Sequence, residues 1–198
     1  MTATNPGFEE RGDTEFLFDF DQFELMDQAG VFNGVEGRVE LIEGKVLQMA
    51  PTSPDHSSAS NDVAVSLTNK LTAQGLYRTA FRVLPNATLK IGERSAPEPD
   101  VLVARPFADH KYPEPSDVAL VVEVSISTRD SDLTSKSRLY AQARIPEYWV
   151  VEPETRKLTV HREPQPDGTW GSVTVLEGDA YVSPLFSSQI HIPLSELF

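Results

Sequence analysis

A nearly continuous apolar run, VALVVEV, occupies residues 118–124 and contains one ionisable residue, Glu123. Such a run is typical of a central β-strand that is covered on both faces. Alternation along the strand predicts two faces, one with Ala119, Val121, Glu123 and Ser125 and the other with Val118, Leu120, Val122 and Val124. An ionisable group is costly to bury in such a strand unless it is paired or has a function. Glu123 is therefore the first candidate functional residue.

The segment that follows has helical periodicity over residues 131–144 and then returns to a strand-like pattern at residues 147–151. A strand, a helix and a strand in this order form a βαβ unit, which predicts parallel strands joined by a right-handed crossover. Asp132 and Lys136 lie four residues apart, hence one turn apart on one face near the start of the helix. We therefore expect an acid and a base to face Glu123 at the end of the first strand.

The rest of the pattern predicts further helices, strands and hairpins around this unit. Apolar positions three and four residues apart predict helices, and alternating segments between Gly, Pro and Asp turns predict strands. The expected helices span residues 21–29 and 56–74. The expected strands span residues 39–42, 45–49, 77–84, 88–91, 101–104, 158–162, 172–176 and 189–192. The strands at 77–84 and 88–91 should pair with the strand that follows Asp100. Together these elements predict an α/β fold with a mixed sheet.

The composition is that of a soluble globular protein, with 39% hydrophobic and 24% charged residues in a chain of 198. We expect a single domain at residues 16–198, preceded by a flexible acidic tail at residues 1–15. No apolar run approaches the roughly 18 residues of a membrane span, and the start of the chain lacks the pattern of a secretory signal. These features predict a cytoplasmic protein with no membrane contact. The absence of Cys excludes disulfides and Cys nucleophiles.

The charge of the chain argues against nonspecific binding to nucleic acid. The formal net charge is −13, whereas phosphate affinity comes largely from Lys and Arg side chains. The charge is unevenly distributed, because residues 1–27 contain eight acidic residues and one basic residue. About half of the net negative charge therefore lies near the start of the chain, and the rest of the chain is only moderately acidic.

Three residues suggest metal-dependent hydrolysis of a phosphodiester. Asp100 stands at the mouth of one predicted strand and Glu123 lies on another, so both carboxylates could hold Mg²⁺. A nearby ammonium group would orient water or offset the charge of the phosphate. In the Asp, Glu-x-Lys arrangement the Lys lies two residues after the Glu, but that position is Ser125 here. A hydroxyl group cannot supply a permanent positive charge. Lys136, in the following helix, is the candidate for a displaced lysine.

A set of short motifs resembles the Uma-two family of restriction endonucleases, within the PD-(D/E)XK nuclease superfamily. The motifs are Pro99-Asp100, Glu123-Val124-Ser125, Asp132 followed by Lys136, Tyr140-Ala141, and Ile145-Pro146-Glu147-Tyr148-Trp149. The resemblance extends from about Phe20 to His161. Two positions depart from the family pattern, with Arg144 where a Gly is usual and Ile126 where a polar residue or Pro is common. Neither departure changes an acid or the lysine, so the affected feature is the local turn.

The resemblance implies a restriction-endonuclease-like core, with a central mixed sheet flanked by helices and with added β-hairpins. It implies that Asp100 and Glu123 bind Mg²⁺ or Mn²⁺ together with the carbonyl of Val124, and that Lys136 positions the attacking water. The implied substrate is DNA. A homodimer is expected because a duplex presents two strands and two-fold dimers are the commonest assembly.

Four further residues are candidates for a supporting role: Ser125 beside Glu123, and Glu40, His56 and Asp132, each of which has a plainer alternative. Glu40 matches the acid of a family motif, Glu-Leu-Ile-x-Gly, but could be a surface charge on a strand. His56 matches a family His and could contact phosphate or metal-bound water, or it could be a capping residue or a solvated one. Asp132 could be catalytic, or it could be an acid favoured by the helix dipole.

Two other functions use the same residues or the same scaffold. One is a noncatalytic binding or regulatory protein that retains the nuclease scaffold, which the acidic charge favours. The other is metal-dependent hydrolysis of a different phosphoester. A Ser-His-Asp hydrolase is poorly supported because the chain has no Gly-x-Ser-x-Gly motif, and it has no Gly-rich nucleotide loop.

Overall fold

The computed structural model describes residues 14–126 and 130–198, with the side chains of residues 130–133 also left out. The helices are α1 (Phe20–Gln28), α2 (Pro54–Ala73) and α3 (Asp130–Gln142), with a short 3₁₀ helix at Leu194–Glu196. The strands are β1 (Val39–Ile42), β2 (Lys45–Gln48), β3 (Arg82–Pro85), β4 (Val101–Ala104), β5 (Val118–Val124), β6 (Glu147–Glu152), β7 (Lys157–Pro164), β8 (Trp170–Glu177), β9 (Tyr181–Val182) and β10 (Ile192–Pro193). The flexible tail expected at residues 1–15 lies almost wholly outside the described residues.

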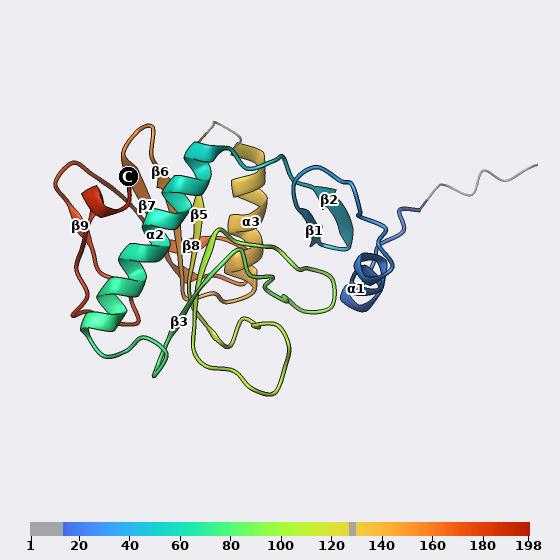
Figure 1. Cartoon of the computed structure of the whole chain (residues 1–198), viewed down its shortest axis with the longest axis horizontal. Helices are drawn as coiled ribbons and strands as arrows, with labels where there is room; N and C mark the ends of the chain where they lie inside the picture. Colours follow the sequence, from blue (N-terminus) through green and yellow to red (C-terminus); the bar gives the residue numbers. More distant parts are fainter. Residues whose placement is uncertain (1–13, 127–129) are drawn as a thin grey trace, which may run out of the picture.

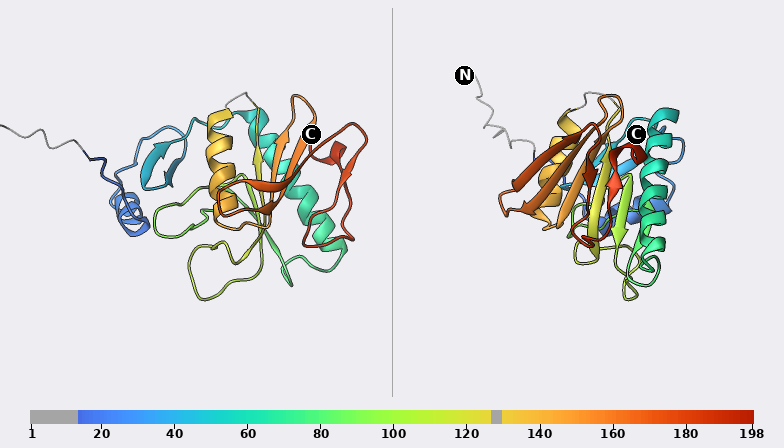
Figure 2. Two further views of the ribbon diagram at one scale, coloured as in Figure 1. Left: turned by 180° about the vertical axis from the view of Figure 1, so that it is seen from behind. Right: turned by 90° about the vertical axis from the view of Figure 1, so that its left-hand side faces the viewer.

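A six-stranded mixed sheet in the order β3-β4-β5-β6-β7-β8 forms the centre of the molecule. Strands β5 and β6 pair in parallel and every other neighbouring pair is antiparallel. Helix α2 packs on one face of the sheet and α3 lies on the other, as the two views of Figure 2 show. The predicted α/β fold and the parallel pairing around α3 are confirmed.

Strand β5 lies inside the sheet and all seven of its residues are buried. Its predicted alternation is wrong at the start, because the pairing with β4 contains a bulge: Val103 faces Leu120 and Ala104 faces Val118. The bulge places Ala119 in the same hydrophobic cluster as Leu120, on the α2 side. Val118 packs instead on the α3 side. Beyond the bulge the alternation is regular, so Glu123 faces α3 as expected.

Helix α3 ends in a turn that leads directly into β6. The N–H of Arg144 donates to the carbonyl of Ala141 and the N–H of Ile145 donates to the carbonyl of Tyr140, each at 3.0 Å. These two bonds form a Schellman motif, in which the residue after the cap is left-handed and is usually Gly. Arg144 holds this position with φ of 62°. The Schellman turn therefore forms here with Arg144 at the left-handed position.

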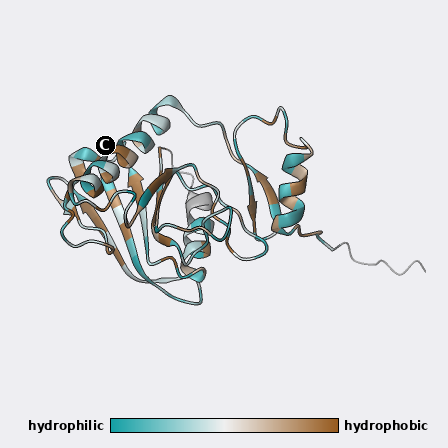
Figure 3. Ribbon diagram, turned by 60° about the horizontal axis from the view of Figure 1, so that its bottom comes forward, coloured by the Kyte–Doolittle hydropathy of each residue, from teal (hydrophilic) through white to brown (hydrophobic). Residues whose placement is uncertain are grey.

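The β1–β2 hairpin and α1 lie beside the sheet rather than in it, at one end of the molecule (Figure 1). Glu43 and Gly44, at φ of 50° and 83°, form the tight turn of the hairpin. Hydrophobic residues mark both of its strands in Figure 3. Leu41 is fully buried and pairs with Ala96, which joins the hairpin to the loop before β4. The hairpin is thereby held next to the end of β4 that carries Asp100.

Some predicted strands are shorter than expected or absent. Residues 88–91 do not form a strand, because the N–H groups of Leu89 and Lys90 donate to the loop carbonyls of Pro97 and Pro113. The strand expected at 77–84 is reduced to β3, which pairs with β4 as predicted. The last strand begins only at Ile192 and pairs with β9. Among the described residues, no helix has the length and apolar character needed to cross a membrane.

Candidate active site

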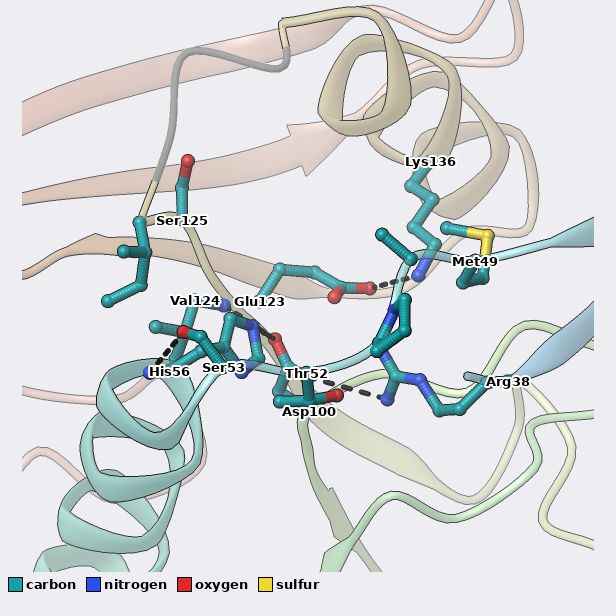
Figure 4. Close-up of a pocket in the computed structure, with 13 residues that line it drawn as sticks. Arg38, Met49, Thr52, Ser53, His56, Asp100, Glu123, Val124, Ser125 and Lys136 are labelled. Atoms are coloured by element: carbon teal, nitrogen blue, oxygen red, sulfur yellow. Dashed lines mark hydrogen bonds and ion pairs between the residues drawn. The ribbon is translucent and has the colours of Figure 1, made fainter. Parts of the chain in front are cut away.

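A pocket of about 350 Å³ opens where the end of β5, the start of β4 and the first turn of α2 meet. The segment between β2 and α2 forms one wall, and α3 contributes a lysine from the other side (Figure 4). The polar and charged side chains that line it are Arg38, Thr52, Ser53, His56, Asp100, Glu123, Ser125 and Lys136. Residues from five segments of the chain therefore meet in one pocket.

Asp100 lies at the base of this pocket with a side chain that is only 2% exposed. Its Oδ2 accepts a hydrogen bond from the N–H of Val124 at 2.8 Å and lies 3.2 Å from Nε2 of His56. Its Oδ1 lies 3.5 Å from Nη1 of Arg38 but has no hydrogen-bond partner among the described residues. Burial opposes ionisation, yet the bond and charge of His56, the Val124 N–H and the charge of Arg38 together lower the pKa of Asp100. Asp100 is therefore a carboxylate with one buried oxygen that lacks a donor.

Glu123 is the second buried carboxylate of the pocket. Its Oε1 accepts a hydrogen bond from the hydroxyl of Tyr140 at 2.8 Å and lies 3.2 Å from Nζ of Lys136. Burial raises the pKa of Glu123 to about 7, although the charge of Lys136 opposes the shift. Glu123 therefore changes its protonation near neutral pH when no metal ion is bound.

Lys136 is buried between two carboxylates from distant parts of the chain. Its Nζ lies 3.1 Å from Oε1 of Glu40 and 3.2 Å from Oε1 of Glu123. Burial would lower the pKa of Lys136, but the charges of Glu123 and Glu40 outweigh it and raise the pKa. Glu40 is completely buried, and its Oε2 has no hydrogen-bond partner among the described residues. The ammonium group is therefore fixed in place and stays protonated.

His56 is positioned by the start of α2. Ser53 caps the helix, and its hydroxyl accepts a hydrogen bond from the N–H of His56 at 3.2 Å. This cap places the imidazole beside Asp100 on one side and Ser60 on the other, with Oγ of Ser60 3.3 Å from Nδ1. The hydrogen bond to Asp100 raises the pKa of His56 above its usual value. His56 therefore holds the carboxylate from the side opposite Arg38.

Arg38 is a residue of this site that the sequence did not reveal. Its Nη1 donates hydrogen bonds to Oδ1 of Asn86 and to the carbonyl of Glu98, each at 3.1 Å. Arg38 belongs to no recognisable motif. It precedes the hairpin by one residue, and only the tertiary fold brings it close to Asp100. An Arg two residues before a candidate acid, Glu40, was the available signal.

The structure brings most of the predicted residues together. His56 contacts Asp100 and Lys136 contacts Glu123, and these four residues line one pocket together with Val124 and Ser125. Glu40 is not a strand-surface charge, since it is buried behind Lys136. The side chain of Asp132 lies outside the described residues.

The residues of the pocket fit a hard divalent cation. Oδ1 of Asp100 is a buried carboxylate oxygen without a donor, and the Glu123 carboxylate lines the same pocket. Within the described parts of the chain, no group of three or more His, Asp or Glu side chains is arranged as a metal site. Mg²⁺ does not need such a cage, because it keeps several waters and is commonly held by one or two carboxylates plus a substrate phosphate. Two carboxylates in an open pocket therefore suit Mg²⁺ or Mn²⁺.

Comparison with known proteins shows the fold and the family of this chain. The crystal structure of "a putative nuclease belonging to DUF820" from Anabaena variabilis has the same fold, with a TM-score of 0.66 and 19% sequence identity. The alignment covers 87% of this chain and 96% of that one. No curated protein matches the chain. The Uma2 (Uma-two) family model, described as "Putative restriction endonuclease", matches residues 20–195. The chain belongs to this family.

Proposed function

We propose that this protein is a DNA endonuclease that uses Mg²⁺ or Mn²⁺ to hydrolyse phosphodiester bonds. Membership of the Uma2 family and the fold support a nuclease. The observation that carries the finer proposal is the buried Oδ1 of Asp100, which accepts no hydrogen bond from the described residues, in a pocket shared with Glu123 and a protonated Lys136. A buried carboxylate oxygen without a donor is costly, and a metal ion would satisfy it.

In this proposal Asp100 and Glu123 would hold the metal ion, and the carbonyl of Val124 would be the third protein ligand. The chemistry supplied at such a site is polarisation of a phosphoryl oxygen and activation of a water molecule. The N–H of Val124 and the imidazole of His56 both contact Oδ2 of Asp100, whereas Oδ1 has no hydrogen-bond partner among the described residues and lies 3.5 Å from Nη1 of Arg38. The first ligand is thus oriented before any metal ion arrives.

Lys136 would supply the positive charge that Ser125 cannot supply from the strand. Its ammonium group lies beside Glu123 and lines the pocket, and an ion pair with the buried carboxylate of Glu40 holds it there. If Glu123 held a metal ion, Glu40 would still be available to pair with Lys136. The ammonium group would then orient the attacking water or offset charge on the phosphate, as the usual strand lysine does. We propose this displaced lysine as the catalytic cation of the site.

The direct test is cleavage of plasmid DNA and a short duplex in the presence of Mg²⁺ or Mn²⁺. We expect the wild type to cleave and Asp100→Asn and Glu123→Gln to be inactive while remaining folded by circular dichroism. Calorimetry should show Mn²⁺ binding to the wild type only. Equal cleavage by all three proteins would indicate a contaminating nuclease, and Mn²⁺ binding to both variants would exclude the metal ligands. Cleavage of other phosphoesters but not of DNA would favour the alternative substrate class.

No cleavage of any phosphoester with either metal ion, by a folded wild type, would favour a noncatalytic protein that keeps the scaffold. The acidic net charge of the chain is the observation on that side. A homodimer and a cytoplasmic location complete the proposal. A mass near 22 kDa by light scattering at micromolar concentration would contradict the dimer.

A further inference from the structure

A nuclease with a net charge of −13 must bind a polyanion, and its proposed catalytic pocket itself contains two carboxylates. A strand of DNA carries phosphates on both sides of the bond that is cut. Each flanking phosphate needs a surface without acidic side chains, because repulsion by fixed carboxylates costs affinity. The pockets that adjoin the catalytic one show where such a surface lies.

Arg38 lines three pockets, and their other residues differ sharply in charge. The first is the catalytic pocket, with Asp100 and Glu123. The second lies beneath α1 and contains three acidic residues, Glu24, Asp27 and Glu98. The third lies between the start of α2 and the end of β3, and none of the described residues that line it is acidic.

The third pocket, of about 320 Å³, adjoins the catalytic pocket, since Arg38, Thr52 and His56 line both. Arg38 and His56 both contact Asp100, so these two side chains stand at the boundary between the pockets. In Figure 4 they lie on either side of the Asp100 carboxylate.

The remaining side chains of the third pocket are uncharged hydrogen-bonding groups, among them Ser57, Asn61 and Asn86. The acidic residues of the same part of α2, Asp55 and Asp62, do not line it. Hydroxyl, amide, imidazole and guanidinium groups are those that proteins use to contact phosphate oxygens.

The Nε of Arg38 is buried and has no hydrogen-bond partner among the described residues. The guanidinium group therefore retains a donor beyond the two bonds that its Nη1 makes to Asn86 and Glu98.

We infer that the third pocket binds the phosphate adjacent to the scissile one, so that the cut DNA strand runs from Asp100 and Glu123 across the first turns of α2 toward Asn86. The inference rests on the proposed function and gives the path of the substrate. It also explains how an acidic protein can bind DNA, because the strand follows the acid-free side of Arg38 and avoids the acidic pocket beneath α1.

The test compares two neighbouring exposed serines of α2. Ser57 lines the third pocket and Ser58 lines none of the pockets described here. Ser57→Glu and Ser58→Glu add the same charge at almost the same place in the helix, so any general effect on folding or long-range charge is shared. We expect Ser57→Glu to weaken binding of a fluorescent duplex in Ca²⁺, measured by anisotropy, about tenfold more than Ser58→Glu does. The slope of log affinity against log salt should fall by about one in Ser57→Glu.

A second pair of variants tests the same pocket with a substitution that does not change the size of the side chain. Asn61→Asp adds a charge in the pocket and Asn69→Asp adds one at an exposed position two turns further along α2. Cleavage of the duplex should show the same ranking in kcat/KM. With thymidine 5′-(p-nitrophenyl phosphate), which has a single phosphodiester and no flanking phosphate, the difference within each pair should shrink to less than about twofold.

Equal losses within both pairs on the duplex would overturn the inference while leaving the nuclease proposal intact. Equal differences on the duplex and on the small diester would also overturn it, because the pocket would then act on the reaction and not on a flanking phosphate. Failure of the wild type to hydrolyse either substrate would be a failure of the proposed function itself. Failure of the wild type to bind the duplex would overturn both proposals.

Discussion

Two parts of the sheet bury carboxylates, and they differ in whether the carboxylate oxygens have hydrogen-bond partners. Glu147, at the start of β6, is completely buried, and both of its oxygens are bonded. Oε1 accepts from Nε1 of Trp149 at 3.0 Å and from Nε and Nη2 of Arg162 at 2.8 and 2.6 Å. Oε2 accepts from the N–H of Leu185 at 2.7 Å. This carboxylate has a full set of partners.

The candidate active site, one strand away, leaves oxygens unused. Asp100 and Glu40 each keep one buried oxygen without a hydrogen-bond partner among the described residues. A buried charge is expensive in either place, but only a satisfied one is explained by folding alone. Burial of an acid is therefore a weak sign of function, and burial with an unused oxygen is a strong one.

The largest expected effect is on catalysis at the unsatisfied site. Lys136→Gln should lower metal-dependent cleavage by roughly 10² to 10⁴ fold, the range found for loss of a positioned group in the transition state. The effect should appear mainly in kcat and should be measured in single-turnover assays with saturating Mg²⁺. Ser125→Lys in the Lys136→Gln background should restore part of the activity if the charge alone matters. Wild-type cleavage by Lys136→Gln would exclude the displaced-lysine mechanism.

Lys136→Gln also leaves Glu40 buried without a cation. We expect the double variant Lys136→Gln/Glu40→Gln to be more stable to urea than Lys136→Gln and no more active. This pair of results separates the structural role of Glu40 from the catalytic role of Lys136. If Glu40→Gln alone abolished cleavage with Lys136 still in place, Glu40 would have a role beyond holding the ammonium group.

Substitution of Glu147, whose oxygens are all hydrogen-bonded, should change the stability of the protein. Glu147→Gln replaces a charged acceptor of four hydrogen bonds with a neutral amide whose NH₂ group faces donors. The free energy of unfolding should fall by roughly 3 kcal/mol, measured by urea denaturation, and cleavage per folded molecule should not change. Glu123→Gln should cost less than about 1 kcal/mol, because Lys136 keeps Glu40 and the amide oxygen still accepts from Tyr140. The reverse ranking would remove the distinction between the two sites.

The sequence predicted the part of the site that is local in the chain. Glu123 and Lys136 lie 13 residues apart on a strand and the helix that follows it, so periodicity alone placed them together. Arg38 and Glu40 reach the same point from a hairpin about 90 residues earlier, and only the packing of that hairpin beside β4 brings them there. For Glu40 the family motif supplied the hint. For Arg38 no local pattern exists.

The errors in the predicted strands have the same origin. Alternation places side chains correctly only while pairing is regular, and the bulge that makes Ala119 an extra residue of β5 is visible only in the pairing with β4. Residues 88–91 have strand-like residues, but their backbone donors find partners in two proline-containing loops. The sequence shows Glu147 only as part of the motif at residues 145–149. Its partners Arg162 and Leu185 lie on later segments, and no sequence pattern near Glu147 predicts them.

A smaller effect concerns pH. Because the pKa of Glu123 is raised to about 7, a proton must leave this carboxylate before a metal ion binds below that pH. Apparent Mn²⁺ affinity, measured by calorimetry, should therefore fall by up to about tenfold per pH unit below pH 7. Without metal the sign is opposite: the folded pKa lies above the unfolded value near 4.5, so stability rises as the pH falls from 7 toward 4.5. Glu123→Gln should lose this rise, and a metal affinity independent of pH would contradict the assignment of Glu123 as a ligand.

The smallest expected effect lies in the turn that joins the two sites. Arg144 ends the helix that carries Lys136 and begins the segment that leads to Glu147, and it holds a left-handed conformation that disfavours any side chain. Arg144→Gly removes this strain of about 1 to 2 kcal/mol, while glycine adds about 0.5 to 1 kcal/mol of entropy to the unfolded chain. The net gain in unfolding free energy should be about 0.5 to 1 kcal/mol, with cleavage unchanged. Arg144→Ala keeps the Cβ and should give no gain, so the two variants together distinguish relief of the backbone from loss of the guanidinium group. An equal gain in unfolding free energy in both variants would show that the charge of Arg144, and not its left-handed backbone, destabilises the turn.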